Sequence, residues 1–152
     1  MTISTTKKLL GATVAAGVIF ALAGCGQAPT ESGSGDGEAA PDFLPCIVSD
    51  QGGFDDKSFN QLSFEGAQKA AEELGVELKD VQSNAETEYG PNVTNLVSEG
   101  CNAIVSVGFA LSAATVEAAT ANPDVDFILV DDAADNDFNG EKDAENVKPL
   151  LY

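Results

Sequence analysis

Three residues with complementary binding chemistry follow the first apolar run of the folded part of the sequence. Asp50 ends the run 46–49, and Phe59 and Asn60 come shortly afterwards, beyond two glycines. An ionised carboxylate accepts hydrogen bonds from hydroxyl or amine donors, and an amide offers both a donor and an acceptor. An aromatic ring can stack on a planar group. These residues therefore indicate a binding site for a planar small molecule that carries hydroxyl groups.

Two later apolar runs end in the same way, one at Gly108 and Phe109 and the other at Asp131. In an open parallel α/β sheet, ligands bind beyond the carboxyl ends of the strands, at helix N-termini. We therefore expect five residues to converge on one edge of a sheet: Asp50, Phe59, Asn60, Phe109 and Asp131. A structural alternative stays open, in which Asp50 caps a turn and Phe59 belongs to the core.

Alternating strand and helix patterns must position these residues. Strands are expected at 46–49, 76–81, 102–107 and 125–130, with a fifth opening at 147–152. Helices are expected from Ser58 to Gly75, from about Pro91 to Gly100, and over about 111–121. Ser58 and Gln61 have the spacing of a capping box at the first helix. Right-handed crossovers make this a doubly wound parallel sheet in the order 2-1-3-4.

The first 42 residues are expected to lie outside this fold. Residues 1–24 have a basic start and an apolar stretch too short to span a bilayer, which is typical of a signal peptide. Leu22-Ala23-Gly24-Cys25 is similar to a lipobox, so Cys25 is expected to become the lipid-modified first residue of the mature chain. The alternative is an ordinary secretory signal. Residues 25–42 are expected to be a flexible tether to the outer face of the membrane.

The formal net charge of −18 argues against nucleic acid as a partner. Cys46 and Cys101 stand at the starts of the first and third strands, so a disulfide is feasible outside the cytoplasm. Two separately buried thiols are the alternative. Two cysteines in a chain without histidine do not make a metal site, and we expect neither a metal nor a cofactor.

The segment Asp135–Asp143 matches the first nine positions of a calcium loop, with Asp135, Asp137 and Asn139 as the ligands. However, the twelfth position is Asn146 where such loops have a bidentate glutamate, and no helix precedes the loop. We therefore interpret the segment as a solvated acidic loop.

Several segments resemble the signature of the basic membrane lipoprotein family, which comprises substrate-binding lipoproteins of ABC transporters. The resemblance extends from Pro45 to Tyr152. It is carried by Asp50-Gln-Gly-Gly-Phe-Asp-Asp-Lys-Ser-Phe-Asn-Gln, Phe64-Glu-Gly, Gly100-Cys-Asn-Ala-Ile-Val-Ser-Val-Gly-Phe, Asn122-Pro-Asp-Val-Asp-Phe-Ile-Leu-Val-Asp-Asp and Asn146-Val-Lys-Pro-Leu-Leu-Tyr.

The resemblance implies that residues 43–152 are the first lobe of a two-lobed type I periplasmic-binding-protein fold, and that the sequence stops short of the second lobe. It further implies that Asp50 and Asn60 bond a purine nucleoside, that Phe59 stacks on its base, and that Asp131 lies at the floor of the cleft. A transporter permease would be the protein partner, and no catalytic residue is expected. The alternatives are a lipoprotein that senses a ligand and an extracytoplasmic hydrolase that uses carboxylates of these turns.

Overall fold

The computed structural model describes residues 42–152. The expected signal peptide at 1–24, the lipid-modified Cys25 and all but the last residue of the expected tether lie outside the described residues. Among the described residues, strands and helices alternate along the chain up to residue 130, after which a loop leads to the last strand. The strands are β1 (Pro45–Ser49), β2 (Lys79–Gln82), β3 (Ala103–Val107), β4 (Asp126–Val130) and β5 (Val147–Leu150). The α-helices are α1 (Phe59–Leu74), α2 (Tyr89–Ser98) and α3 (Ser112–Ala121), and short 3-10 turns at Glu86–Glu88 and Phe109–Leu111 lead into α2 and α3.

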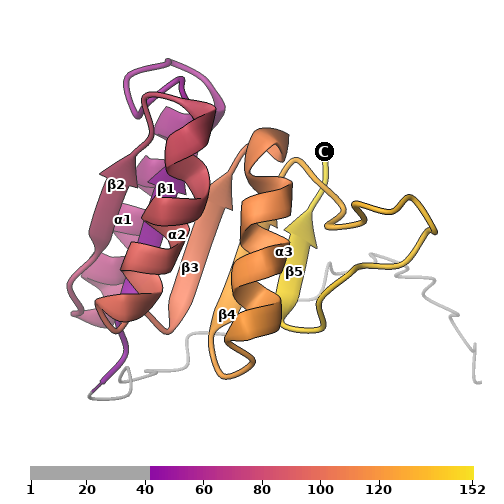
Figure 1. Cartoon of the computed structure of the whole chain (residues 1–152). Helices are drawn as coiled ribbons and strands as arrows, with labels where there is room; N and C mark the ends of the chain where they lie inside the picture. Colours follow the sequence, from indigo (N-terminus) through magenta and orange to yellow (C-terminus); the bar gives the residue numbers. More distant parts are fainter. Residues whose placement is uncertain (1–41) are drawn as a thin grey trace, which may run out of the picture. The chain divides into compact units, whose positions relative to one another are not determined.

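The five strands form one parallel sheet in the order β2-β1-β3-β4-β5 (Figure 1). This confirms the predicted doubly wound α/β sheet and its order 2-1-3-4, to which β5 is added beside β4. β1 lies inside the sheet, between β2 and β3, and four of its five residues are buried. A continuous apolar strand of this kind is typical of a parallel sheet that has helices on both faces.

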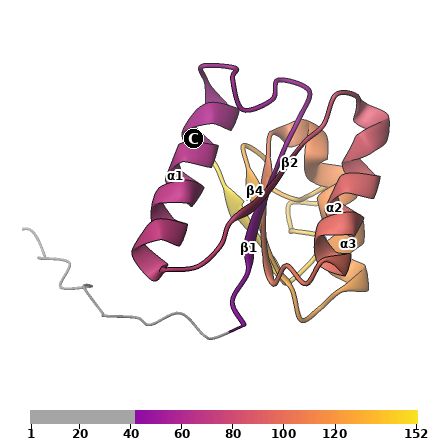
Figure 2. The same cartoon turned by 90° about the vertical axis from the view of Figure 1, so that its left-hand side faces the viewer.

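Helix α1 covers one face of the sheet, and α2 and α3 cover the other (Figure 2). The core on the α1 face is small: Ile47, Val107 and Val130 pack there with Phe54, next to Phe64 of α1. The larger core on the opposite face contains alternate strand residues together with Val93, Leu96 and Ala118 from the two helices. Because strand side chains alternate between faces, each buried strand contributes to both cores.

The ends of the elements differ slightly from the predicted ones. The second strand was expected at 76–81 but occupies Lys79–Gln82, since the chain leaves α1 through Gly75 in a left-handed conformation (φ 68°) and needs several residues to return to the sheet. Gly75 does end the first helix, as predicted, and its N–H donates back to the last turn. The shift matters because it places Gln82, the last residue of β2, beside the turn that follows β1.

A disulfide joins Cys46 in β1 to Cys101, just before β3, with a Cα–Cα separation of 5.9 Å. Both cysteines are almost completely buried in the larger core. The bridge lies at the amino ends of β1 and β3, so it fixes the edge of the sheet opposite to the edge where Asp50 and Gly108 follow the same two strands. None of the helices formed by residues 42–152 combines the length and the apolar character that crossing a membrane requires.

Candidate ligand-binding site

The turn after β1 is organised by the carboxylate of Asp50. Its Oδ1 accepts hydrogen bonds from the backbone N–H of Gly52 at 2.8 Å and from Nδ2 of Asn60 at 2.7 Å. Its backbone carbonyl accepts the N–H of Gly53 at 3.2 Å, which closes the turn. Asp50 therefore holds its own turn, as the structural alternative required, and also ties that turn to the first residues of α1.

Helix α1 is capped by Asp56, whereas the sequence predicted a capping box of Ser58 and Gln61. The Ser58 side chain makes no capping hydrogen bond. Oδ1 of Asp56 instead accepts the backbone N–H groups of Ser58 and Gln61 at 2.8 and 3.0 Å, and Oδ2 accepts the N–H of Asn60 at 3.1 Å. The capping-box prediction is wrong because a carboxylate two residues earlier reaches the same donors with a full negative charge.

The pKa of Asp56 lies below its ordinary value. Loss of contact with water raises this pKa, but the hydrogen bonds donated by the backbone of Gln61, Ser58 and Asn60, and by the Asn60 side chain, stabilise the charged form and outweigh that effect. Asp56 therefore stays ionised to lower pH than a free aspartate.

Asn60 links the two carboxylates. Its Nδ2 donates to Oδ1 of Asp50 and, at 3.2 Å, to Oδ2 of Asp56. The residue is only 3% exposed, and its Oδ1 is buried without a hydrogen-bond partner among the described residues. A buried acceptor without a donor is uncommon in folded proteins and asks for an explanation.

Two glycines allow this network to pack closely. A Cβ on Gly52 would lie 2.8 Å from Nδ2 of Asn60, and a Cβ on Gly108 would lie 2.8 Å from Oδ2 of Asp50. Gly108 also has a φ of 103°, which side-chain-bearing residues rarely adopt. The end of β3 therefore approaches the Asp50 carboxylate in a way that only glycine permits.

The sheet register places the residues that follow β1, β3 and β4 in one row. Ser49 pairs with Val107, and Val107 pairs with Val130, so Asp50, Gly108 and Asp131 are the next residues of three neighbouring strands. Asp131 is exposed, has a φ of 67°, and donates its N–H to the carbonyl of Leu150 at 2.8 Å. Asp50 and Asp131 thus lie at the same edge of the sheet, with one strand between them.

The two phenylalanines reach this edge but do not face a common hollow. Phe59 is 47% exposed, so the alternative that assigned it to the core is wrong. It lines a small hollow of about 180 Å³ with Leu62 and Tyr152. Phe109 is 67% exposed and lines another hollow, of about 540 Å³, with Glu86 and Glu117. The structure therefore brings Asp50 and Asn60 into contact and leaves Phe59 and Phe109 on separate surfaces.

Sequence reasoning missed two residues that shape the turn, namely Asp56 and Gln82. Oε1 of Gln82 accepts the backbone N–H of Phe54 at 3.0 Å and so ties the turn to the end of β2. The sequence carried a signal for Asp56, because an aspartate shortly before a helix start is a good acceptor for the first N–H groups. No local pattern indicated Gln82, whose role depends on strand pairing.

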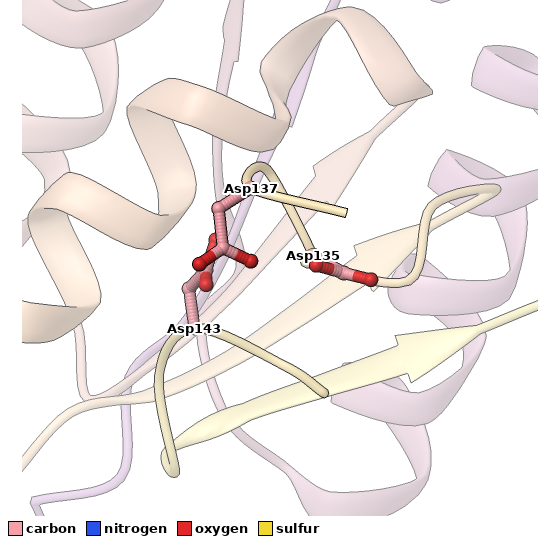
Figure 3. Close-up of side chains that lie close together, drawn as sticks. All are labelled: Asp135, Asp137 and Asp143. Carbon is pink, nitrogen blue, oxygen red and sulfur yellow. The ribbon is translucent and has the colours of Figure 1, made fainter. Parts of the chain in front are cut away.

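The acidic loop after β4 brings together the carboxylates of Asp135, Asp137 and Asp143, with oxygen atoms within 4.8 Å of one another (Figure 3). Asn139, the third ligand of the calcium pattern, instead donates its backbone N–H to Asp135 and Asp137. Asp143 accepts the N–H of Asn136 at 2.7 Å. These carboxylates therefore serve as acceptors for the loop's own backbone.

The edge of the sheet is suited to binding, because it presents hydrogen-bond acceptors and exposed aromatic rings on a parallel α/β scaffold. In such sheets the carboxyl ends of the strands are the usual ligand site. Comparison with known sequences also indicates a substrate-binding protein. Residues 44–150 match the family described as ABC transporter substrate-binding protein PnrA-like, and the chain belongs to this family.

Curated relatives agree with this assignment. The chain is 34% identical over 128 residues to the CD4+ T-cell-stimulating antigen of Listeria innocua. This alignment covers 81% of the chain and 35% of the relative. The chain is also 32% identical over 143 residues to the ABC transporter nucleoside-binding protein BmpA of Lactococcus lactis. This alignment covers 91% of the chain and 38% of that protein. The chain thus spans little more than a third of the length of these relatives.

Solved structures show the same fold. A solute-binding protein of an ABC transporter system from Aeropyrum pernix is 28% identical and superimposes with a TM-score of 0.61, over 72% of the chain and 28% of that protein. A lipoprotein fragment from Peptoclostridium difficile superimposes with a TM-score of 0.60 over 72% of the chain and 85% of the fragment. At 15% identity, the second match shows the fold alone.

Proposed function

We propose that this chain contributes the first lobe of an extracytoplasmic solute-binding lipoprotein that delivers its ligand to an ABC importer, and that the ligand is a purine nucleoside. The observation that carries the proposal is the row formed by Asp50, Gly108 and Asp131, with Asn60 bonded to Asp50, at the carboxyl edge of a sheet that belongs to a substrate-binding family.

The chemistry of the row supports a ligand that donates hydrogen bonds. Carboxylates of Asp50 and Asp131 suit the hydroxyl groups of a sugar and the amino or ring N–H groups of a base. The exposed ring of Phe59, at the first position of α1, offers a stacking surface for a planar base. The name of the Lactococcus lactis relative, a nucleoside-binding protein, agrees with this ligand class.

The rest of the proposal concerns location and partners. The lipobox-like segment that ends at Cys25 supports a lipid anchor on the outer face of the membrane, with residues 25–42 as the tether. The partner would be the membrane permease of the transporter. We propose binding without chemical conversion, in keeping with membership of a substrate-binding family.

Titration of the full chain with adenosine, guanosine, inosine and cytidine, followed by ¹⁵N NMR, tests the proposal. Purine nucleosides are expected to shift the amide signals of Asp50, Asn60 and Gly108, and cytidine is expected to shift them less. Asp50→Asn should weaken the purine-induced shifts, whereas Asp124→Asn, at an exposed site before β4, should not. Equal weak shifts with every nucleoside, or shifts confined to other surfaces, would contradict the proposal.

A further inference from the structure

The start of α1 is already occupied by a carboxylate of the chain itself. The N-terminus of a helix is normally a ready site for anions, because its first N–H groups lack partners and carry a partial positive charge. Here Asp56 accepts three of those N–H groups, from Ser58, Asn60 and Gln61. A ligand phosphate would have to compete with this internal anion for the same donors.

The same carboxylate fixes the orientation of the Asn60 amide. Nδ2 donates one hydrogen bond to Asp50 and one to Asp56, so both of its hydrogens are used. Reversing the amide would place Oδ1 against two carboxylates. Oδ1 is thereby left as an acceptor, and it is the buried side-chain atom that lacks a donor among the described residues. The missing partner of this network is therefore a donor.

The charges around this network have the same sign. Asp50 and Asp56 both contribute carboxyl groups to the network, and Asp131 follows in the same row of the sheet edge. Within 50–60 the basic residue is Lys57, whose side chain is exposed and takes no part in the network. A phosphorylated ligand would meet carboxylates at each of these positions, which is unfavourable at short range.

We propose that Asp56 is a positioning residue that makes the site select uncharged ligands with hydrogen-bond donors and exclude phosphorylated ones. It does so by occupying the anion site of α1 and by orienting Asn60 so that its buried Oδ1 is an acceptor without a donor among the described residues. The inference rests on the proposed function, in that it assigns the site to a nucleoside in preference to its 5′-monophosphate.

The test compares adenosine, its 5′-monophosphate and inorganic phosphate on the full chain, with ¹⁵N NMR of the Ser58, Asn60 and Gln61 amides. The wild type is expected to bind adenosine about tenfold or more tightly than the monophosphate, and phosphate alone should leave these amides unmoved. In Asp56→Asn, phosphate should shift the amides, and the preference for adenosine should fall about threefold or more. Asp55→Asn removes the same charge from an exposed neighbour outside the network and should behave as the wild type.

Two results would overturn the inference. One is a wild type whose α1 amides respond to phosphate as they respond to adenosine, and the other is an equal gain of phosphate binding in Asp55→Asn and Asp56→Asn. If adenosine does not bind the wild type, the proposed function fails, but the phosphate titrations still decide the role of Asp56. If Asp56→Asn does not fold, hydrogen exchange of the Asn60 side-chain amide in the wild type decides it, because the proposed network requires slow exchange of both hydrogens.

Discussion

Asn60, at the second position of α1, donates a 2.7 Å hydrogen bond to Oδ1 of Asp50, the residue that follows β1. The bond joins two residues that the sequence had singled out separately, one for its charge and one for its amide. It fixes the turn between β1 and α1, so substitutions around this turn are expected to change both stability and ligand binding.

Gly108→Ala is expected to displace the Asp50 carboxylate, although residue 50 itself is unchanged. The new Cβ would lie 2.8 Å from Oδ2 of Asp50, and the backbone φ of 103° is strained for alanine. We expect the free energy of unfolding to fall by about 1–3 kcal/mol, together with weaker ligand binding. Urea denaturation measures the first effect.

The control is Gly66→Ala inside α1, where a Cβ meets nothing within 4 Å. Helix propensity predicts that this substitution raises the free energy of unfolding by about 0.5–1 kcal/mol. Equal effects at both glycines would contradict the close approach.

Removal of the disulfide is expected to destabilise the fold substantially. The bridge joins two cysteines that are 55 positions apart in the sequence, and constraining the unfolded chain over a loop of this size is worth about 4 kcal/mol in the entropic account. The double variant Cys46→Ala/Cys101→Ala should therefore unfold at a much lower urea concentration than the wild type. Adding reductant to the wild type should lower its midpoint too. A midpoint that reductant leaves unchanged, or two free thiols in the exported protein by mass spectrometry, would show that the pair is not bonded.

Asp56 is expected to make the stability of the chain depend on pH. Its pKa is lowered in the folded state, so its contribution is fully present above the unfolded pKa near 4 and is lost as pH falls through the folded pKa. Asp56→Asn should cost about 0.5–2 kcal/mol at pH 7, and this difference from the wild type should shrink at an acidic pH below the folded pKa. Urea midpoints at the two pH values provide the measurement. A difference that does not change with pH would mean that the Asp56 charge does not stabilise α1.

Phe59→Ala is expected to weaken ligand binding and to leave the stability of the fold almost unchanged. Because the Phe59 side chain is 47% exposed, its removal should change the free energy of unfolding by less than about 0.5 kcal/mol. Loss of a stacking surface should weaken purine binding by about 0.5–1.5 kcal/mol, or about two- to tenfold. Phe138→Ala, which removes an aromatic ring that is 89% exposed on the acidic loop, should affect neither quantity. Unchanged binding in Phe59→Ala would remove Phe59 from the site.

The acidic loop is expected to need no calcium. Asp135 and Asp143 already accept backbone N–H groups of the loop, so the loop has internal partners for its carboxylates. Thermal unfolding of the full chain in the presence of millimolar calcium and in the presence of a chelator should give the same midpoint within about 1 °C. A large rise with calcium that disappears in Asp135→Asn would instead establish a cation site.

The order of the sheet and the positions of Asp50, Gly108 and Asp131 could be predicted because apolar runs, glycines and terminal aspartates mark the strand ends locally. Parallel pairing then brings those ends to one edge of the sheet. The capping role of Asp56 could not be ranked above that of Ser58, since both offer an oxygen near the helix start. The geometry of the turn decides between them.

The separation of Phe59 from Phe109 could not be predicted either. Each phenylalanine follows a strand end, but the direction of each ring depends on the helix that packs beside it. Phe109 lies next to α3, and Phe59 belongs to α1 on the opposite face of the sheet. Sequence position gives the edge of the sheet but not the face to which a side chain at that edge turns.

The disulfide between Cys46 and Cys101 closes a covalent loop, and this loop contains the whole turn around Asp50, Asp56 and Asn60. A protease that cuts the exposed part of this turn would therefore nick the polypeptide without releasing either piece. The products would run as two fragments on a gel with reductant and as one band without it. If Cys25 carries the proposed anchor, a nicked molecule would also stay on the cell surface, since the fragment after the cut remains covalently attached to the anchored one.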